Sequence, residues 1–142
     1  MHEWSLAEAV VKAVFDLIEQ RGASRVSELE VVYGELMSLD SELMAEAIRE
    51  LSAGSPLEGA EIRIIEEPAR IRCRSCGSEF SLSEIEIGGP KIFEEGHGQE
   101  HLLHFLPDLA PALLRCPGCG SSDLEVDSGG SLRISKVVLE WS

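Results

Sequence analysis

The cysteines of this sequence fall into two closely spaced pairs, Cys73-Arg74-Ser75-Cys76-Gly77 and Cys116-Pro117-Gly118-Cys119-Gly120. We call residues 73–77 the first knuckle and residues 116–120 the second. Each knuckle ends on a glycine, which leaves backbone amides able to face thiolate sulfur. Two such pairs are typical of a tetrahedral four-sulfur metal cage. We therefore predict a metal site formed by Cys73, Cys76, Cys116 and Cys119, with no cysteine left over for nucleophilic catalysis.

Zinc and iron both suit such a cage, and they imply different functions. Zinc would be structural, because four thiolates leave no open position for water. Iron would make a rubredoxin-like electron carrier, which the Cys-Pro-x-Cys-Gly form of the second knuckle also fits. The long polar spacer, residues 77–115, favours zinc. Disulfides are disfavoured, because the sequence has no signal peptide or long apolar run and indicates a cytoplasmic protein without a membrane partner.

The first residues, Met1, His2 and Glu3, offer a second set of ligands. A bulky second residue should prevent removal of Met1, so a free α-amine would stand next to the imidazole of His2. The amine, deprotonated backbone amides and the imidazole can surround a divalent ion in one plane. Square-planar nitrogen ligation selects nickel(II) or copper(II) over zinc. The carboxylate of Glu3 is either a partner contact or a solvated charge.

Three histidines, His97, His101 and His104, lie in the spacer between the knuckles. On a helix they would share one face, a spacing that can chelate a metal. We expect His97 and His101 to be exposed in a mobile loop. His104 lies in the apolar stretch of residues 102–107, which we expect to be ordered, so it is either a packed core residue or a placed ligand.

The charge of the chain argues against nucleic acid as a partner. Its 26 acidic and 12 basic side chains give a formal net charge of -14, and phosphate contacts need clustered lysine and arginine. The local exception is Arg70, Arg72 and Arg74, which we expect to offset the charge of the thiolates. There is no phosphate-binding Gly-x-x-x-x-Gly-Lys loop and no Ser-His-acid arrangement, so an enzyme is not predicted. A zinc-ribbon adaptor protein remains an alternative.

The rest of the chain predicts the elements that position these residues. Ser5 and Glu8 form a capping-box pattern, which predicts a helix from there to Gly22 with Met1 to Trp4 outside it. Asp40 is expected to cap a second helix that ends before Gly54. Alternating apolar residues predict strands at residues 25–33, 60–66, 124–126 and 132–141, the last with a bulge near Lys136.

Together these elements predict an α/β fold: a small mixed three-stranded sheet with two helices, into which a zinc-ribbon-like domain is inserted. The α/β domain, which would bind nickel, is discontinuous and comprises residues 1–68 and 128–142. The zinc-binding domain comprises residues 69–127.

The Met-His-Glu-x-Ser start, the α/β domain and the two knuckles before a C-terminal hairpin resemble the HypA family of nickel-insertion accessory proteins. The resemblance covers essentially the whole chain and implies a non-catalytic nickel metallochaperone for [NiFe]-hydrogenase; some members also serve urease. It implies that nickel binds through Met1, His2 and Glu3, and structural zinc through the four cysteines. The implied partners are a nucleotide-hydrolysing protein of the HypB type and the large subunit of the hydrogenase.

The spacer is longer than in the shortest family members and similar to that of some archaeal members. Within it, we take His104 as the candidate for a further nickel ligand that moves onto the metal when a partner docks. The sequence leaves open whether the working form is a monomer or a dimer.

Overall fold

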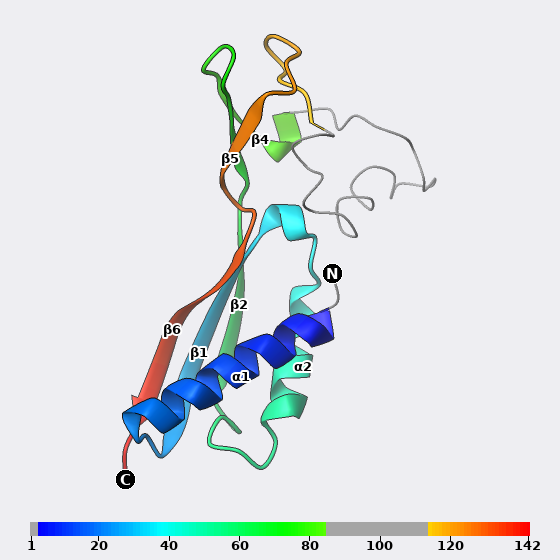
Figure 1. Ribbon diagram of the computed structural model, residues 1–142. Helices are drawn as coiled ribbons and strands as arrows, with labels where there is room; N and C mark the ends of the chain where they lie inside the picture. Colours follow the sequence, from blue (N-terminus) through cyan, green and yellow to red (C-terminus); the bar gives the residue numbers. More distant parts are fainter. Residues whose placement is uncertain (1–2, 85–113) are drawn as a thin grey trace. The chain divides into compact units, whose positions relative to one another are not determined.

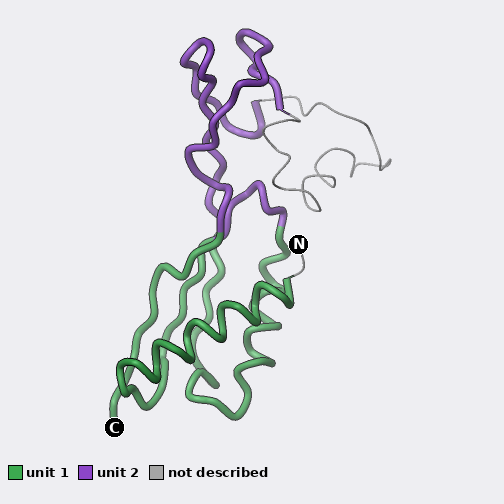
Figure 2. The backbone as a smooth tube through the Cα atoms, viewed as in Figure 1, with its two compact units in different colours: residues 1–32, 39–65, 132–142 green, residues 33–38, 66–131 purple. Residues whose placement is uncertain are grey.

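The computed structural model describes residues 3–84 and 114–142, and the chain divides into two compact units (Figure 2). Unit 1 comprises residues 1–32, 39–65 and 132–142, and unit 2 comprises residues 33–38 and 66–131. The predicted boundaries lie at residues 68/69 and 127/128. Unit 2 contains the expected residues 69–127 with a few residues on either side, and also the short segment of residues 33–38, whose Leu36 is buried in one cluster with Ala69 and Ile71.

Unit 1 is a three-stranded sheet with helices α1 (Glu3–Arg21) and α2 (Ser41–Ser52). Its strand order is β2 (Glu61–Glu67), β1 (Arg25–Gly34) and β6 (Leu132–Glu140). Strands β1 and β2 run in the same direction and β6 runs in the opposite one, while both helices lie on one face of the sheet (Figure 1). The predicted mixed α/β fold is confirmed.

The start of α2 follows the prediction, whereas the start of α1 does not. The Oδ1 atom of Asp40 accepts hydrogen bonds from the backbone amides of Glu42 at 3.0 Å and Leu43 at 3.2 Å. In α1, Ser5 is the third helical residue, so the predicted capping box is wrong. The helix extends to Glu3, whose negative charge in the first turn is favourable at the positive end of a helix.

The core of unit 1 consists of aliphatic side chains from both helices and the central strand. On α1 every third or fourth residue is buried, the spacing of one helix face. The buried residues are Ala7, Val10, Val11, Val14, Ile18, Val26, Leu29, Val31, Met44, Ala47, Ile48 and Leu57. Apolar residues of β2 and β6 pack against this cluster, so the core needs all three segments of unit 1.

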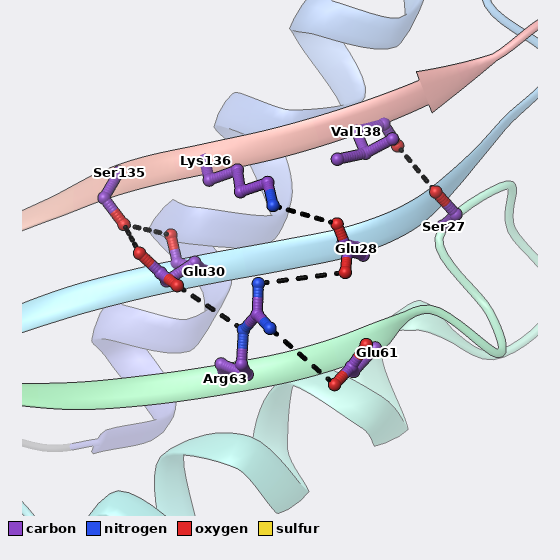
Figure 3. Close-up of polar contacts among 8 residues, drawn as sticks. All are labelled: Ser27, Glu28, Glu30, Glu61, Arg63, Ser135, Lys136 and Val138. Carbon is purple, nitrogen blue, oxygen red and sulfur yellow. Dashed lines mark hydrogen bonds and ion pairs between the residues drawn. The ribbon is translucent and has the colours of Figure 1, made fainter.

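The face of the sheet that the helices leave open carries a network of charged side chains (Figure 3). Arg63 lies 3.4 Å from the carboxylate of Glu30 and 3.8 Å from that of Glu28, and Lys136 lies 3.1 Å from Glu28. Ser135 and Lys136 are consecutive exposed residues, so the burial alternation of β6 changes phase at the site of the predicted bulge. Because these side chains are charged and partly exposed, this face of the sheet is suited to contact with water.

Unit 2 contains a second, antiparallel sheet in the order β4 (Glu79–Ser81), β3 (Arg70–Cys73) and β5 (Leu124–Ser128). Short 3-10 turns occupy Glu35–Met37 and Leu82–Glu84. The pairing of Cys73 with Leu124 brings the ends of the two knuckles together. The buried core beneath the sheet is Leu36, Ala69, Ile71, Cys73, Phe80, Leu114, Cys116 and Leu124.

Two glycines of unit 2 allow backbone segments to cross closely. A Cβ atom at Gly34 would overlap the carbonyl of Gly129, and one at Gly129 would overlap the backbone of Ala69. Gly129 also has a φ of 83°, which side chains other than glycine rarely adopt. The amide of Leu36 donates to the carbonyl of Gly129 at 3.0 Å, so residues 33–38 are held against the turn before β6.

Within residues 3–84 and 114–142, no helix has the length and apolar character needed to cross a lipid bilayer.

Candidate metal centre

The four cysteine sulfurs converge at one end of the unit 2 sheet, where all four lie within 4.8 Å of one another. The Sγ atoms of Cys73 and Cys119 are 3.6 Å apart, and those of Cys76 and Cys116 are 3.7 Å apart. These separations are far too long for a disulfide. A tetrahedral site with zinc–sulfur bonds of about 2.3 Å has sulfur–sulfur edges of about 3.8 Å. The cage therefore has the dimensions of a four-thiolate zinc site, and the predicted convergence of these residues is observed.

The two knuckles have the same backbone hydrogen bonds. The amide of Cys73 donates to the carbonyl of Ser78 at 2.8 Å, and the amide of Cys116 donates to that of Ser121 at 2.9 Å. The amides of Gly77 and Gly120 each donate back to the carbonyl of the first cysteine of their knuckle at 2.9 Å. Gly77 has a φ of 78° and Gly120 a φ of 76°, so glycine is favoured at the end of each loop.

Each knuckle presents one buried and one exposed cysteine. Cys73 and Cys116 are buried in the unit 2 core, whereas Cys76 and Cys119 are exposed. Hydrogen bonds with the hydroxyl and the backbone of Ser78, and with neighbouring thiols, together lower the pKa of Cys76 to about 6. At Cys119 the Ser121 backbone amide lowers the pKa, but the neighbouring thiol of Cys73 and the partial loss of contact with water raise it, to about 12 in sum. Four thiolates this close repel one another, and a bound divalent cation would remove that repulsion.

Arg72 and Arg74, which were predicted to offset the charge of the thiolates, pair with carboxylates instead. Arg72 forms an ion pair with Glu125, and Arg74 lies 3.2 Å from Asp123. Hydrogen bonding to Arg72 lowers the pKa of the Glu125 carboxyl. Carboxylates on and before β5 are thus the partners of these two guanidinium groups, because the β3–β5 pairing places them opposite each other.

Most of the predicted nickel ligands lie outside the described residues: Met1, His2 and His104, together with His97 and His101. Glu3 is described and is the half-buried first residue of α1. As the first helical residue, it contributes a backbone amide that has no intrahelical acceptor. That amide is therefore not committed to the helix.

Sequence reasoning missed the serines that surround the cage. Ser78 Oγ lies 3.2 Å from the sulfur of Cys76, and Ser75 Oγ lies 2.9 Å from Ser121 Oγ. A signal was present, because each Cys-x-x-Cys-Gly knuckle is followed by a serine, Ser78 or Ser121. The repeated pattern is therefore Cys-x-x-Cys-Gly-Ser, which indicates that the serines belong to the same local structure as the ligands.

Comparison with known proteins assigns the chain to a family. Residues 1–139 match the model of the family described as hydrogenase/urease nickel incorporation, metallochaperone, HypA. The chain belongs to the HypA family. Hydrogenase maturation factor HypA of Thermococcus kodakarensis is 39% identical over 140 residues, covering 99% of this chain and 96% of that protein. The HypA of Pyrococcus furiosus is 40% identical over the same coverage.

Solved HypA structures share the fold. The solution structure of the Ni metallochaperone HypA from Helicobacter pylori superimposes with a TM-score of 0.60 at 17% identity, covering 100% of both chains. A second structure, described as the solution structure of HypA protein, gives a TM-score of 0.61 at 17% identity and covers 100% of this chain and 98% of that one. At this identity the likeness concerns the fold alone.

Proposed function

We propose that this chain is a nickel metallochaperone for the maturation of [NiFe]-hydrogenase, with a structural zinc in the four-cysteine cage. The observation that carries the proposal is the match to the HypA family model from residue 1 to residue 139, which includes the Met1-His2-Glu3 start. The family's printed description is nickel incorporation for hydrogenase and urease. The chain contributes metal handling and no catalysis of its own.

Nickel(II) is bound by the amine of Met1, the imidazole of His2 and the backbone nitrogens of His2 and Glu3. Support comes from the start of α1 at Glu3, because the first backbone amides of a helix have no carbonyl within the helix to which they can donate a hydrogen bond. A planar set of nitrogens prefers nickel or copper to zinc. His104 is the candidate for an additional ligand, recruited when a partner docks.

Zinc is held by Cys73, Cys76, Cys116 and Cys119. Sulfur–sulfur separations of 3.6 and 3.7 Å support this assignment, since they match the edges of a zinc tetrahedron. Zinc there has no open coordination position, so its role is to hold the knuckles together. The nickel is cargo, and it is passed to the large subunit of the hydrogenase in the cytoplasm together with a nucleotide-hydrolysing HypB-type partner.

The proposal is tested by elemental analysis and nickel titration of untagged protein that begins at Met1. Wild type should hold one zinc per chain and take up one nickel, whereas His2→Ala should keep the zinc and lose tight nickel binding. An N-terminal extension should act like His2→Ala, because it removes the free amine. His104→Ala is the matched histidine variant and should bind nickel in the absence of a partner.

Several results would contradict the proposal. Tight nickel binding by His2→Ala would overturn the N-terminal site. Weak nickel binding by every form, with zinc present, would favour the zinc-ribbon adaptor. A coloured protein containing iron in place of zinc would favour the rubredoxin-like carrier. Nickel affinity should also fall as the pH falls through about 6.5, where an ordinary imidazole takes up a proton.

A further inference from the structure

The matching backbone of the two knuckles pairs their residues one to one. Cys73 and Cys116 occupy the same position, as do Ser78 and Ser121, whose carbonyls accept the same hydrogen bond. Ser75 of the first knuckle therefore corresponds to Gly118 of the second. Within the six-residue pattern the two knuckles differ at two positions, where Arg74 and Ser75 of the first knuckle correspond to Pro117 and Gly118 of the second.

One side of the cage is bridged by contacts that involve no sulfur. Ser75 Oγ and Ser121 Oγ are 2.9 Å apart, and Ser121 Oγ also accepts the amide of Asp123 at 3.0 Å. The amide of Arg74 donates to the carbonyl of Asp123 at 2.9 Å, and their side chains lie 3.2 Å apart. We call these four residues the clasp. None of these four residues is a metal ligand, so the clasp joins the two knuckles without using a coordination position.

The opposite side of the cage lacks the equivalent contact. Gly118 has no hydroxyl to reach Ser78, although Ser78 stands where Ser121 stands on the first side. A Cβ atom at Gly118 would lie 3.8 Å from Ser78 Oγ and 3.8 Å from Cys116 Sγ, which is ordinary van der Waals contact. A serine therefore fits at position 118, and the partner for its hydroxyl is already in place.

We propose that the clasp keeps one side of the cage closed and that metal leaves by opening of the other side, at Gly118. The inference rests on the proposed zinc site and goes beyond it by assigning the direction of opening. Ser75 and Ser121 are positioning residues, which act on the sulfurs through the knuckle backbone. The Arg74–Asp123 ion pair contributes little, because its side chains are 56% and 59% exposed and water screens their charges.

The test is the rate at which the full-length, zinc-loaded chain releases zinc to an excess of chelator at fixed pH. Ser75→Ala should release zinc faster, by roughly two- to tenfold, the kinetic equivalent of one hydrogen bond. Ser75→Thr keeps the hydroxyl and should restore the wild-type rate. Gly118→Ser should slow release by a similar factor, whereas Gly118→Ala, which adds only the Cβ atom, should not.

Glu125→Gln is the matched control for charge, because it removes an ion pair of the same chemistry from the β3–β5 ladder. It should leave the release rate unchanged. Equal rates for Gly118→Ser and Gly118→Ala, or for Ser75→Ala and wild type, would overturn the proposal. Zinc content is measured before release: a wild type without zinc overturns the proposed zinc site itself, whereas normal zinc content with equal rates overturns only the clasp.

Discussion

The two units of this chain are stabilised in different ways. Unit 1 has a core of aliphatic side chains from two helices and a sheet, and in the described part of the chain none of its buried core residues is a cysteine. The buried core of unit 2 is smaller in the described residues, and two of its members, Cys73 and Cys116, are themselves predicted metal ligands. The comparison indicates that unit 1 can hold its fold by burial alone, whereas unit 2 depends on its cage.

The largest effect should follow removal of metal from the cage. Treatment with a strong chelator, or Cys73→Ser, should abolish the ordered structure around β3 and β5, because Cys73 and Cys116 are ligands and also members of the described core of unit 2. Amide hydrogen exchange should show loss of protection at residues 70–73 and 124–128 and retained protection in α1 and α2. Readdition of zinc to the chelated protein is the control and should restore protection. Loss of amide protection in both units at once would contradict the view that only unit 2 depends on its metal cage.

A substitution in the aliphatic core should destabilise unit 1 and leave the metal cage of unit 2 unchanged. Ile48 is fully buried on α2, and Ile48→Ala should lower the free energy of unfolding of unit 1 by about 2–5 kcal/mol through lost burial and a cavity. Zinc content should not change. Ile65→Ala is the matched control, since Ile65 is 42% exposed, and its effect should be much smaller. Loss of zinc from Ile48→Ala would show that the units do not fold separately.

A smaller effect is expected at the start of α2. Asp40→Ala removes the acceptor of two backbone amides and should cost about 1 kcal/mol of unit 1 stability. Denaturant unfolding monitored by helical circular dichroism measures this change. Glu46→Ala, on the exposed side of the same helix, provides the comparison, and an equal loss in both variants would argue against the cap.

The smallest effect concerns the charged face of the unit 1 sheet. A hydrogen bond from Lys136 lowers the pKa of Glu28 below its ordinary value of 4.5. The stabilisation by the ionised carboxyl is therefore present above pH 4.5 and is lost as the pH falls through the lowered folded-state value. Glu28→Gln should unfold at a slightly lower temperature than wild type at neutral pH, and the two should converge in acid. Glu50→Gln changes an exposed carboxyl on α2 and is the control, which should unfold at the wild-type temperature at neutral pH and in acid. A difference in unfolding temperature between Glu28→Gln and wild type that does not change with pH would contradict the explanation.

The sequence predicted best what is encoded by local spacing. Four cysteines in two short pairs predicted the cage, and Asp40 before an apolar stripe predicted the α2 cap. The same local reasoning failed at Ser5, where a capping-box pattern lies inside a helix that extends to Glu3. Helix starts are decided by packing as well as by caps, and Ala7 and Val10 of the first turns are buried in the core.

What the sequence could not predict depends on contacts between distant residues. Strands β3 and β4 have four and three residues, too few to show an alternation, and they are defined by their pairing. The assignment of residues 33–38 to unit 2 follows from the close approach of Gly34 and Gly129, which no local pattern reveals. The serine bridge between the knuckles likewise joins residues 46 positions apart.

The division of unit 1 into three segments has a consequence for biosynthesis. Strand β6 pairs with β1, and the amide of Ser24 donates to the carbonyl of Glu140 at 2.8 Å. A ribosome that has made both helices and both knuckles has therefore still not supplied the third strand of the first sheet. All three strands of the unit 2 sheet precede β6 in the chain, so the unit 2 sheet has its full set of strands earlier in synthesis than the unit 1 sheet.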